Sequence, residues 1–463
     1  MLIRLSGPRR FLRSLSTLAG LAAALTLAAP VQAQAQSLIR DTEIEATLHH
    51  FSAPLMEAAG LRPEDVTILL VGDKELNAFA GAGQVMGLNS GTIIQAETPN
   101  QLKGVIAHEL GHIAGAHPAR RGEMSRAGMQ PFLLTLGLGA LAALAGAPDA
   151  GAALAMSSGH FGTLGALKYS REQEGRADQA AVTYLEKTGQ SGQGLVDFFE
   201  NFRYQEVFSE ARRYPYFVSH PLSSDRIQAL RRRVEASPTR DVKDSPEDVE
   251  RLKIAKAKLE GFLDPPQSTF IKYKESDRSF PARYARAIAY YRATETEKAL
   301  AAIDALLGEQ PDNPFLWELK GQVLFESGRA REAEAPHRRA VELMPEAPLL
   351  RINLAQALLA QEDRTRVAEA EDHLRKALAR EEDNSFAWRL MAQAHDMTGA
   401  PGLARLASAE AHFALGDLKQ AKVFAMRARE QLRADSPEWR RATDIVLVSK
   451  PTDADLKAIG KGS

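Results

Sequence analysis

The sequence predicts a mainly α-helical protein with two folded parts: an N-terminal α+β domain with a small antiparallel sheet, and a C-terminal α-solenoid of helix pairs. Three observations predict this. A chain of 463 residues exceeds what one hydrophobic core usually serves. Two short strand-like runs near residues 66 and 85 stand among stretches of helical periodicity. Beyond Pro281, apolar and small residues recur at an interval of 34 residues.

Residues 1–35 differ from the rest of the chain. Four arginines precede an alanine-rich apolar stretch from Leu15 to Pro30, and Ala33-Gln34-Ala35 offers a small-residue cleavage site. These are the parts of a signal peptide, so we expect export to the periplasm followed by cleavage. The alternative is an uncleaved anchor helix, although the stretch is short. Arg9-Arg10 leaves both the general and the twin-arginine export routes open.

Charge and cysteine content exclude several classes. The chain has 58 basic and 59 acidic residues, a formal net charge of −1, and loss of the arginines of residues 1–35 lowers it to −5. This balance leaves no footprint for binding nucleic acid. Because the chain has no cysteine, any metal site must be built from histidine and carboxylate ligands.

We assign residues 36–262 to the first domain. Residues 41–61 have the periodicity of a helix with one apolar face. Residues 66–71 form a β-branched strand, and residues 84–95 contain a second strand. We expect these two strands to pair in antiparallel orientation, with the second at an edge of the sheet. Another helix begins at Thr98.

The helix that follows Thr98 carries the strongest chemical signal. His108 and His112 are four residues apart, so they lie on one helix face and can hold a single Zn²⁺ ion, with Glu109 beside them. A zinc site that keeps a place for water needs a third protein ligand. Residues 170–178 look helical and carry Glu174 and Asp178 four apart, so one carboxylate could bind the metal while the other orients a ligand histidine. The alternative is two helices with solvated polar faces.

His117 and residues 132–147 permit other interpretations. His117 is one position short of the third histidine of the metzincin pattern, where Pro118 stands, so we interpret it as a helix-end or surface residue. Residues 132–147 are apolar and lie between Pro131 and Pro148. They are shorter than the about 20 residues that a membrane-spanning helix needs. We expect a mobile hairpin or lid beside the site, with peripheral membrane contact as the alternative.

The C-terminal part is divided into a linker at residues 263–280, repeats at 281–434 and a tail at 435–463. Tyr290 and Ala299 recur 34 residues later as Leu324 and Ala333, in a tetratricopeptide pattern. The spacing then loosens, which we attribute to an insertion around Gly399. A generic alanine-rich helical bundle is the alternative.

Several ordered motifs resemble one family. They resemble the exported members of the HtpX and BepA group of gluzincin metallopeptidases, peptidase family forty-eight. The shared motifs are Asn77-Ala78-Phe79-Ala80, the run from Ala107 to His112, Ser170-Arg171 with Glu174 and Ala177-Asp178, and His220-Pro221 with Arg226-Ile227.

This resemblance implies roles for the motif residues. It implies that one Zn²⁺ ion per chain is held by His108, His112 and Glu174, and that Glu109 is the general base. It further implies that Asp178 supports a ligand histidine, that His220 lies over the metal and gates activity, and that Arg226 is a polar partner of the site. The catalytic group predicted in this way is therefore Glu109, His220, Asp178 and Arg226.

The resemblance also implies a function. We expect a periplasmic zinc metalloendopeptidase that hydrolyses unfolded or misassembled envelope proteins, bound as extended strands along residues 85–89, while the repeats recruit substrate or the outer-membrane assembly machinery. The alternative is a tetratricopeptide adaptor or chaperone whose hydrolysis is silenced by His220 or by the lid. A third possibility is a membrane-embedded protease anchored through residues 132–147.

Overall fold

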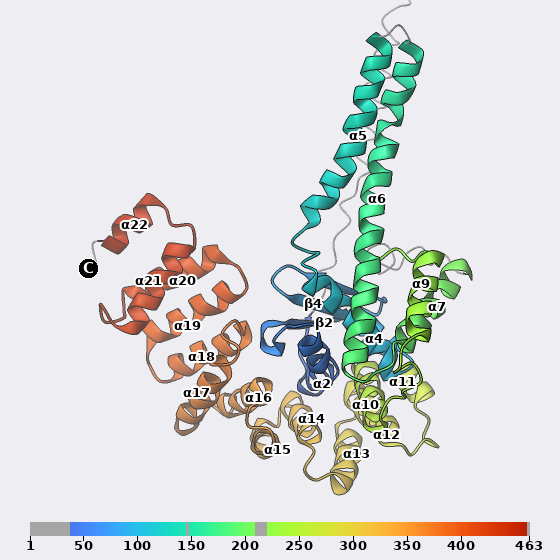
Figure 1. Cartoon of the computed structure of the whole chain (residues 1–463). Coiled ribbons are helices and arrows are strands. Elements are labelled where there is room, and N and C mark those ends of the chain that lie inside the picture. The colour runs from blue at the N-terminus through green and yellow to red at the C-terminus, as the bar shows by residue number, and fades with distance from the viewer. Residues whose placement is uncertain (1–37, 145–147, 209–219, 461–463) are drawn as a thin grey trace, which may run out of the picture. The chain divides into compact units, whose positions relative to one another are not determined.

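The computed structural model describes residues 38–144, 148–208 and 220–460 (Figure 1). The predicted signal peptide and its cleavage site therefore lie outside the described residues. The chain is mainly α-helical with one small sheet, as the sequence predicts. No helix among these described residues combines the length and the hydropathy that crossing a membrane requires.

The sheet is mixed, so the predicted antiparallel sheet is wrong. Its strands are β1 (Leu38–Ile39), β2 (Thr67–Val71), β3 (Ala78–Gly81) and β4 (Val85–Asn89), in the order β1-β2-β4-β3. The two strands read from the sequence, β2 and β4, pair in parallel. The reason is β3, a strand of only four residues that was not predicted. It turns into β4 through Gly83 and Gln84, both at positive φ, so β4 lies inside the sheet and β3 at its edge.

Three helices contribute side chains to one hydrophobic core. They are α2 (Thr42–Ala58), α3 (Ser90–Gln95) and α4 (Pro99–Ala114). Asp41 caps α2 by accepting hydrogen bonds from the amides of Glu43 and Ile44, and Thr98 caps α4 through the amide of Gln101. Almost every residue of α4 is buried, because the helix packs against α2, β3, α6 and α7. The predicted helix beginning at Thr98 is thus the centre of the first domain.

Residues 132–147 belong to a much longer feature than the sequence predicts. Helix α5 (Arg121–Leu144) and helix α6 (Pro148–Lys187) lie side by side as a long antiparallel pair (Figure 1). Pro131 lies inside α5, so it does not bound the segment. Residues 145–147, between the helices, lie outside the described residues. The C-terminal part of α6 packs on α4. Helices α7 (Gln193–Phe208) and α9 (Ser224–Glu235) come next in the chain and pack against each other.

The C-terminal region is a series of helix pairs joined to the first domain by α10 (Pro246–Leu263) and α11 (Pro266–Lys272), the latter within the predicted linker. The pairs are α12 (Phe280–Arg292) with α13 (Thr296–Glu309), α14 (Pro314–Glu326) with α15 (Ala330–Leu343), α16 (Pro348–Leu359) with α17 (Arg364–Leu378), and α18 (Ser385–Met397) with α19 (Pro401–Ala414). Helices α20 (Leu418–Arg429), α21 (Pro437–Val448) and α22 (Asp453–Gly460) follow, so the predicted tail contains two helices.

The turn inside each pair keeps the repeat register. Thr294, Gly328 and Glu362 have positive φ and are 34 residues apart, and Gly399 follows with the same geometry. Gly399 therefore occupies the regular turn position, and the predicted insertion there is wrong. The extra length lies before it, in α17 and the loop of residues 379–384. Only residues that tolerate the left-handed region suit this turn without strain, and glycine supplies it twice.

A buried polar cluster joins α2 to the repeats. Lys258 Nζ of α10 lies 2.8 Å from Asp41 Oδ2 and 3.2 Å from Glu43 Oε2. The hydroxyl of Tyr284 in α12 donates a 2.9 Å hydrogen bond to Glu43. Glu318 of α14 is buried beside them and accepts a hydrogen bond from Asn353 at 3.1 Å. Buried charges are tolerated only when paired, so this cluster fixes α10, α12 and α14 against α2.

Candidate metal centre

Helix α4 places two imidazoles side by side in the core. His108 and His112 are buried, and their Nε2 atoms are 3.1 Å apart. Gly111, between them, makes room for α6: a Cβ at this position would lie 2.9 Å from both the Cα and the carbonyl oxygen of Ala177. The glycine of the motif is therefore a packing requirement that lets α6 approach the two histidines.

Helix α6 brings Glu174 to the same point. Its Oε2 lies 3.4 Å from His108 Nε2, and its Oε1 lies 3.5 Å from His112 Nε2. Glu174 is buried, whereas Glu172 on the same helix is exposed. The structure thus brings together the three residues predicted as ligands.

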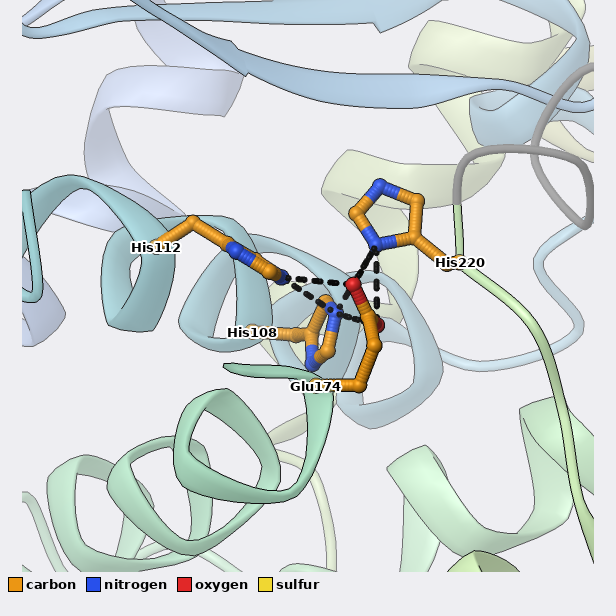
Figure 2. Close-up of side chains that lie close together, drawn as sticks. All are labelled: His108, His112, Glu174 and His220. Carbon is orange, nitrogen blue, oxygen red and sulfur yellow. Dashed lines mark hydrogen bonds and ion pairs between the residues drawn. The ribbon is translucent and has the colours of Figure 1, made fainter. Parts of the chain in front are cut away.

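His220 completes the group (Figure 2). Its Nδ1 lies 3.3 Å from His108 Nε2 and 3.1 Å from Glu174 Oε2. Each of the four side chains offers a ligand atom, all of these atoms lie within 4.8 Å of one another, and all four residues are buried. Figure 2 shows the four side chains pointing to a common point from α4, α6 and the segment before α9.

The spacing of these atoms fits a small divalent cation. Ligand nitrogen and oxygen atoms lie about 2.0–2.2 Å from zinc, so tetrahedral neighbours are about 3.4 Å apart. Five separations between these nitrogen and carboxylate oxygen atoms run from 3.1 to 3.5 Å, and the four ligand atoms all lie within 4.8 Å of one another. Imidazole and carboxylate are zinc ligands, and the chain has no thiolate to offer. The donor set therefore fits zinc, with His220 at the fourth position.

Asp178 and Arg226 form a layer behind the ligands. Asp178 Oδ1 lies 3.0 Å from His108 Nδ1, the nitrogen that faces away from the other ligands. Arg226 of α9 donates to both oxygens of Asp178, at 2.5 and 2.9 Å, and lies 2.9 Å from Glu174 Oε2. One guanidinium therefore aligns two carboxylates, and one of these fixes the orientation of His108.

Glu109 is buried beside the ligands and differs from them. Neither of its carboxylate oxygens has a hydrogen-bond partner within the described part of the chain. His220 Nε2 lies 3.6 Å from Oε1. Burial raises the pKa of Glu109, and the charge of His220 partly opposes the rise. Burying a carboxylate without a hydrogen bond costs free energy. A buried carboxyl group with a raised pKa is therefore a candidate for a functional role.

The electrostatics separate the two histidines of α4. Burial by itself lowers the pKa of His108, but hydrogen bonds with Asp178 and Glu174 outweigh it and raise the pKa to about 9. Burial, followed by the charge of His108, lowers the pKa of His112 to about 2. Burial raises the pKa of Glu174, yet hydrogen bonds with His108 and His220 hold it well below its usual range. The carboxylate therefore stays ionised among the imidazoles.

Two further residues contact the site and were not predicted. His117, interpreted from the sequence as a helix-end or surface residue, is half-buried just after α4, and its Nδ1 lies 2.9 Å from His112 Nδ1. The ring of Phe199 from α7 meets His108 edge-on, and Arg226 lies over its face at 5.0 Å. His117 is therefore not placed as a third histidine ligand. It contacts the far side of the predicted ligand His112. Nothing in the sequence pattern identifies Phe199.

Two parts of the chain match known protein families. Residues 40–234 match the profile of peptidase family M48, and residues 281–404 match the cytochrome c-type biogenesis protein H TPR domain. The beta-barrel assembly-enhancing protease of Escherichia coli (strain K12) is 25% identical over 412 residues, covering 87% of this chain and 82% of that protein.

Two other relatives agree with this. The putative beta-barrel assembly-enhancing protease of Vibrio cholerae serotype O1 is 26% identical over 374 residues, covering 79% of this chain and 75% of that protein. Metalloprotease LoiP of Escherichia coli (strain K12) is 34% identical over 167 residues, covering 35% of this chain and 60% of that protein. The family resemblance read from the motifs is confirmed: the chain carries a metallopeptidase domain of peptidase family M48, followed by a TPR domain.

Proposed function

We propose that this protein is a periplasmic zinc metalloendopeptidase that cleaves unfolded or misassembled envelope proteins. The observation that carries the proposal is the buried grouping, within 4.8 Å of one another, of ligand atoms from His108, His112, Glu174 and His220, with the carboxylate of Glu109 buried beside them. In the proposed site His108, His112 and Glu174 hold one zinc ion per chain. When bound, zinc would acidify a water molecule and polarise the scissile carbonyl.

The chain's own residues supply the proton transfers. The Glu109 carboxylate accepts a proton from the attacking water as the new carbon–oxygen bond forms, and it returns the proton to the leaving amine as the carbon–nitrogen bond breaks. Its buried position suits this role, because burial raises its pKa towards the operating range. Asp178 and Arg226 act as positioning residues, since they hold His108 and Glu174 in place.

His220 is proposed as a gate. Its Nδ1 lies among the ligand atoms, in the place that a water molecule or a substrate carbonyl would need. Hydrolysis would therefore require this side chain to move aside. Its Nε2 lies 3.6 Å from Glu109 Oε1, so the same movement would free the proposed base.

The predicted position of the bound substrate strand is wrong. The sequence placed it along residues 85–89, but β4 is paired on both sides, with β2 and with β3. Among the described strands, β3 lies at an edge of the sheet, and it packs against α4. We infer that an extended chain adds to the outer side of β3, through main-chain hydrogen bonds that demand little sequence. Only unfolded or mispaired segments are free to bind in this way.

The repeats are proposed to recruit substrates or assembly partners. A cavity of about 1020 Å³ is lined by residues of β2, α2, α10, α14, α16 and α18 and by His337 of α15. Glu318 Oε2 and His337 Nδ1 line it without a hydrogen-bond partner among the described residues, and both side chains are buried. Buried polar atoms without partners favour a polar ligand. The name of these relatives, beta-barrel assembly-enhancing protease, supports outer-membrane protein assembly as the setting, and the signal peptide predicted at residues 1–35 supports the periplasm.

The test is metal content together with hydrolysis of an unfolded model protein such as reduced casein. The unaltered chain should hold one zinc, and His108→Ala and Glu174→Ala should lose it. Glu109→Gln should retain zinc and lose hydrolysis by at least about a hundredfold, because general base catalysis typically contributes 10²–10⁴-fold. Zinc retained in Glu174→Ala would reject Glu174 as a ligand.

A second candidate is an adaptor or chaperone with silenced hydrolysis. It is favoured by the position of His220 within the ligand group. The two functions separate on Glu109→Gln: partner binding and suppression of aggregation should survive in an adaptor, whereas a function that depends on cleavage should be lost.

A further inference from the structure

The outer part of the α5–α6 pair is almost free of charge. Between Arg126 and Lys168 the sequence has a single ionised residue, Asp149. Tyr169 donates a 2.7 Å hydrogen bond to Glu123, so residue 123 on α5 is level with residue 169 on α6. The uncharged stretch therefore begins at the same height on both helices.

Large apolar side chains are exposed on this outer part. Seventeen are exposed in the described chain, and nine of them lie here, so the exposure is concentrated. Met156 is 87% exposed and Leu134 is 68% exposed. The nine residues are Met129, Leu133, Leu134, Leu136 and Leu138 on α5, with Met156, Phe161, Leu164 and Leu167 on α6. A concentration of this kind marks an interaction surface.

On α5 the exposed residues are not confined to one narrow stripe. Leu134 follows Leu133 directly and projects about 100° from it around α5. Leu136 is two positions beyond Leu134 and projects about 200° from Leu134. A protein groove covers one stripe of a helix, whereas a lipid phase contacts every side. The distribution therefore favours a lipid surface over a protein groove.

Basic side chains collect where the apolar part ends. We call this group the basic collar: Arg120 just before α5, Arg126 in its second turn, and Lys168, Arg171 and Arg176 on α6. All five are exposed, and the exposed acidic residues beside them are Glu123 and Glu172. An apolar segment flanked by basic residues matches the depth profile of an anionic membrane, with hydrocarbon inside and phosphate at the surface.

We propose that the α5–α6 pair binds anionic lipid bilayers peripherally, with its outer apolar part in the lipid and the basic collar against the headgroups. This inference goes beyond the proposed peptidase activity and does not depend on it. It has a consequence for the site, because Glu174 lies six residues after Lys168 on the same helix, a rise of about 9 Å. The metal centre would face chains that emerge at a membrane surface.

The experiment is flotation of the chain lacking residues 1–35 with vesicles of phosphatidylcholine alone and of phosphatidylcholine mixed equally with phosphatidylglycerol. The protein should float with the anionic vesicles and much less with the neutral ones, and added salt should weaken the binding. Replacing Arg126 and Lys168 by Gln should lower the partition coefficient at least about tenfold on anionic vesicles.

A matched pair of variants tests the apolar surface. Leu134→Gln, Leu138→Gln and Leu164→Gln together should abolish flotation, with unchanged circular dichroism, because these side chains are exposed. The control carries Ile271→Gln, Leu415→Gln and Val448→Gln, which lie elsewhere and are somewhat more exposed than the three leucines, and it should float like the unaltered chain. Absence of flotation, equal flotation of the first variant, or equal loss in the control would overturn the proposal. The proposal would also be overturned if the three leucines were needed for binding unfolded casein and the protein did not bind vesicles.

Discussion

At the scale of single residues, Asp178 shows how a site depends on groups that would not touch the metal. Asp178→Asn keeps the shape of the side chain but removes the charge that faces His108 Nδ1 and Arg226. We expect zinc affinity to fall about 10- to 100-fold, as is usual for partners behind metal ligands. Competition with a zinc chelator measures this.

The control for Asp178 lies on the same helix. Glu172→Gln removes an exposed carboxylate two residues before Glu174 and should leave the affinity unchanged. Equal affinities of Asp178→Asn and the unaltered chain would show that the contact with His108 has no role in holding zinc.

His220 gives a second prediction at this scale. In His220→Ala three ligand side chains remain, so zinc content should be unchanged. Hydrolysis of casein should rise about threefold to tenfold, because activity grows in proportion when a minor competent state becomes dominant. Steady-state kcat measures the change. A fall in kcat with zinc retained would contradict gating and point to a contact between His220 and the substrate.

At the scale of elements, the approach of α6 to α4 rests on Gly111. A Cβ there would meet the backbone of Ala177 at 2.9 Å, and backbone has little freedom to move away. Gly111→Ala should lower the free energy of unfolding by about 1–3 kcal/mol, the usual cost of overpacking. It should also weaken zinc binding, because Glu174 is carried by the displaced helix.

Gly308 in α13 is the matched control, since a Cβ at that position meets nothing within 4 Å. Gly308→Ala should leave stability unchanged or raise it slightly, because alanine favours helix. Urea unfolding of both variants separates close packing from helix propensity. Equal stabilities would mean that α6 can shift without cost.

At the scale of the whole molecule, the polar cluster between α2 and the repeats makes stability depend on pH. Burial raises the pKa of Glu318 to about 8, opposed by Lys258 and reinforced by Asp41 and Glu43. Because the folded pKa exceeds the unfolded value, the contribution of this group to stability is full below about 4.5 and is lost as pH rises towards 8.

The corresponding variant is Glu318→Gln, which cannot ionise. Its midpoint of urea unfolding relative to the unaltered chain should rise between pH 5 and pH 8 and then level off. Glu309→Gln, on the exposed surface of α13, has no such burial and serves as the control. A difference that does not change with pH would contradict the raised pKa of Glu318.

Much of the fold and part of the metal centre could be predicted from regular spacing in the sequence. The interval between His108 and His112 places them on one helix face without reference to any other element. The 34-residue interval fixes the turns at Thr294, Gly328 and Glu362 in the same way. The first feature follows from the spacing of residues on one helix and the second from repetition of one helix pair along the chain, so neither requires knowledge of the tertiary contacts.

Tertiary structure decided what depends on partners distant in the chain. The parallel pairing of β2 with β4 depends on β3, whose four residues are too few to show an alternating pattern. The uninterrupted course of α5 through Pro131 depends on its packing along α6. The position of His117 behind His112 needs the turn at Ala116, which has positive φ.

For this protein, the sequence by itself determined which residues could serve as ligands, and only the packing of α6 on α4 decided that Glu174 meets them. Glu174 is 62 residues beyond His112, and no local preference specifies a contact over that distance. The physical reason is that close packing of whole helices, here at Gly111 against Ala177, sets the distances between side chains that each helix merely orients.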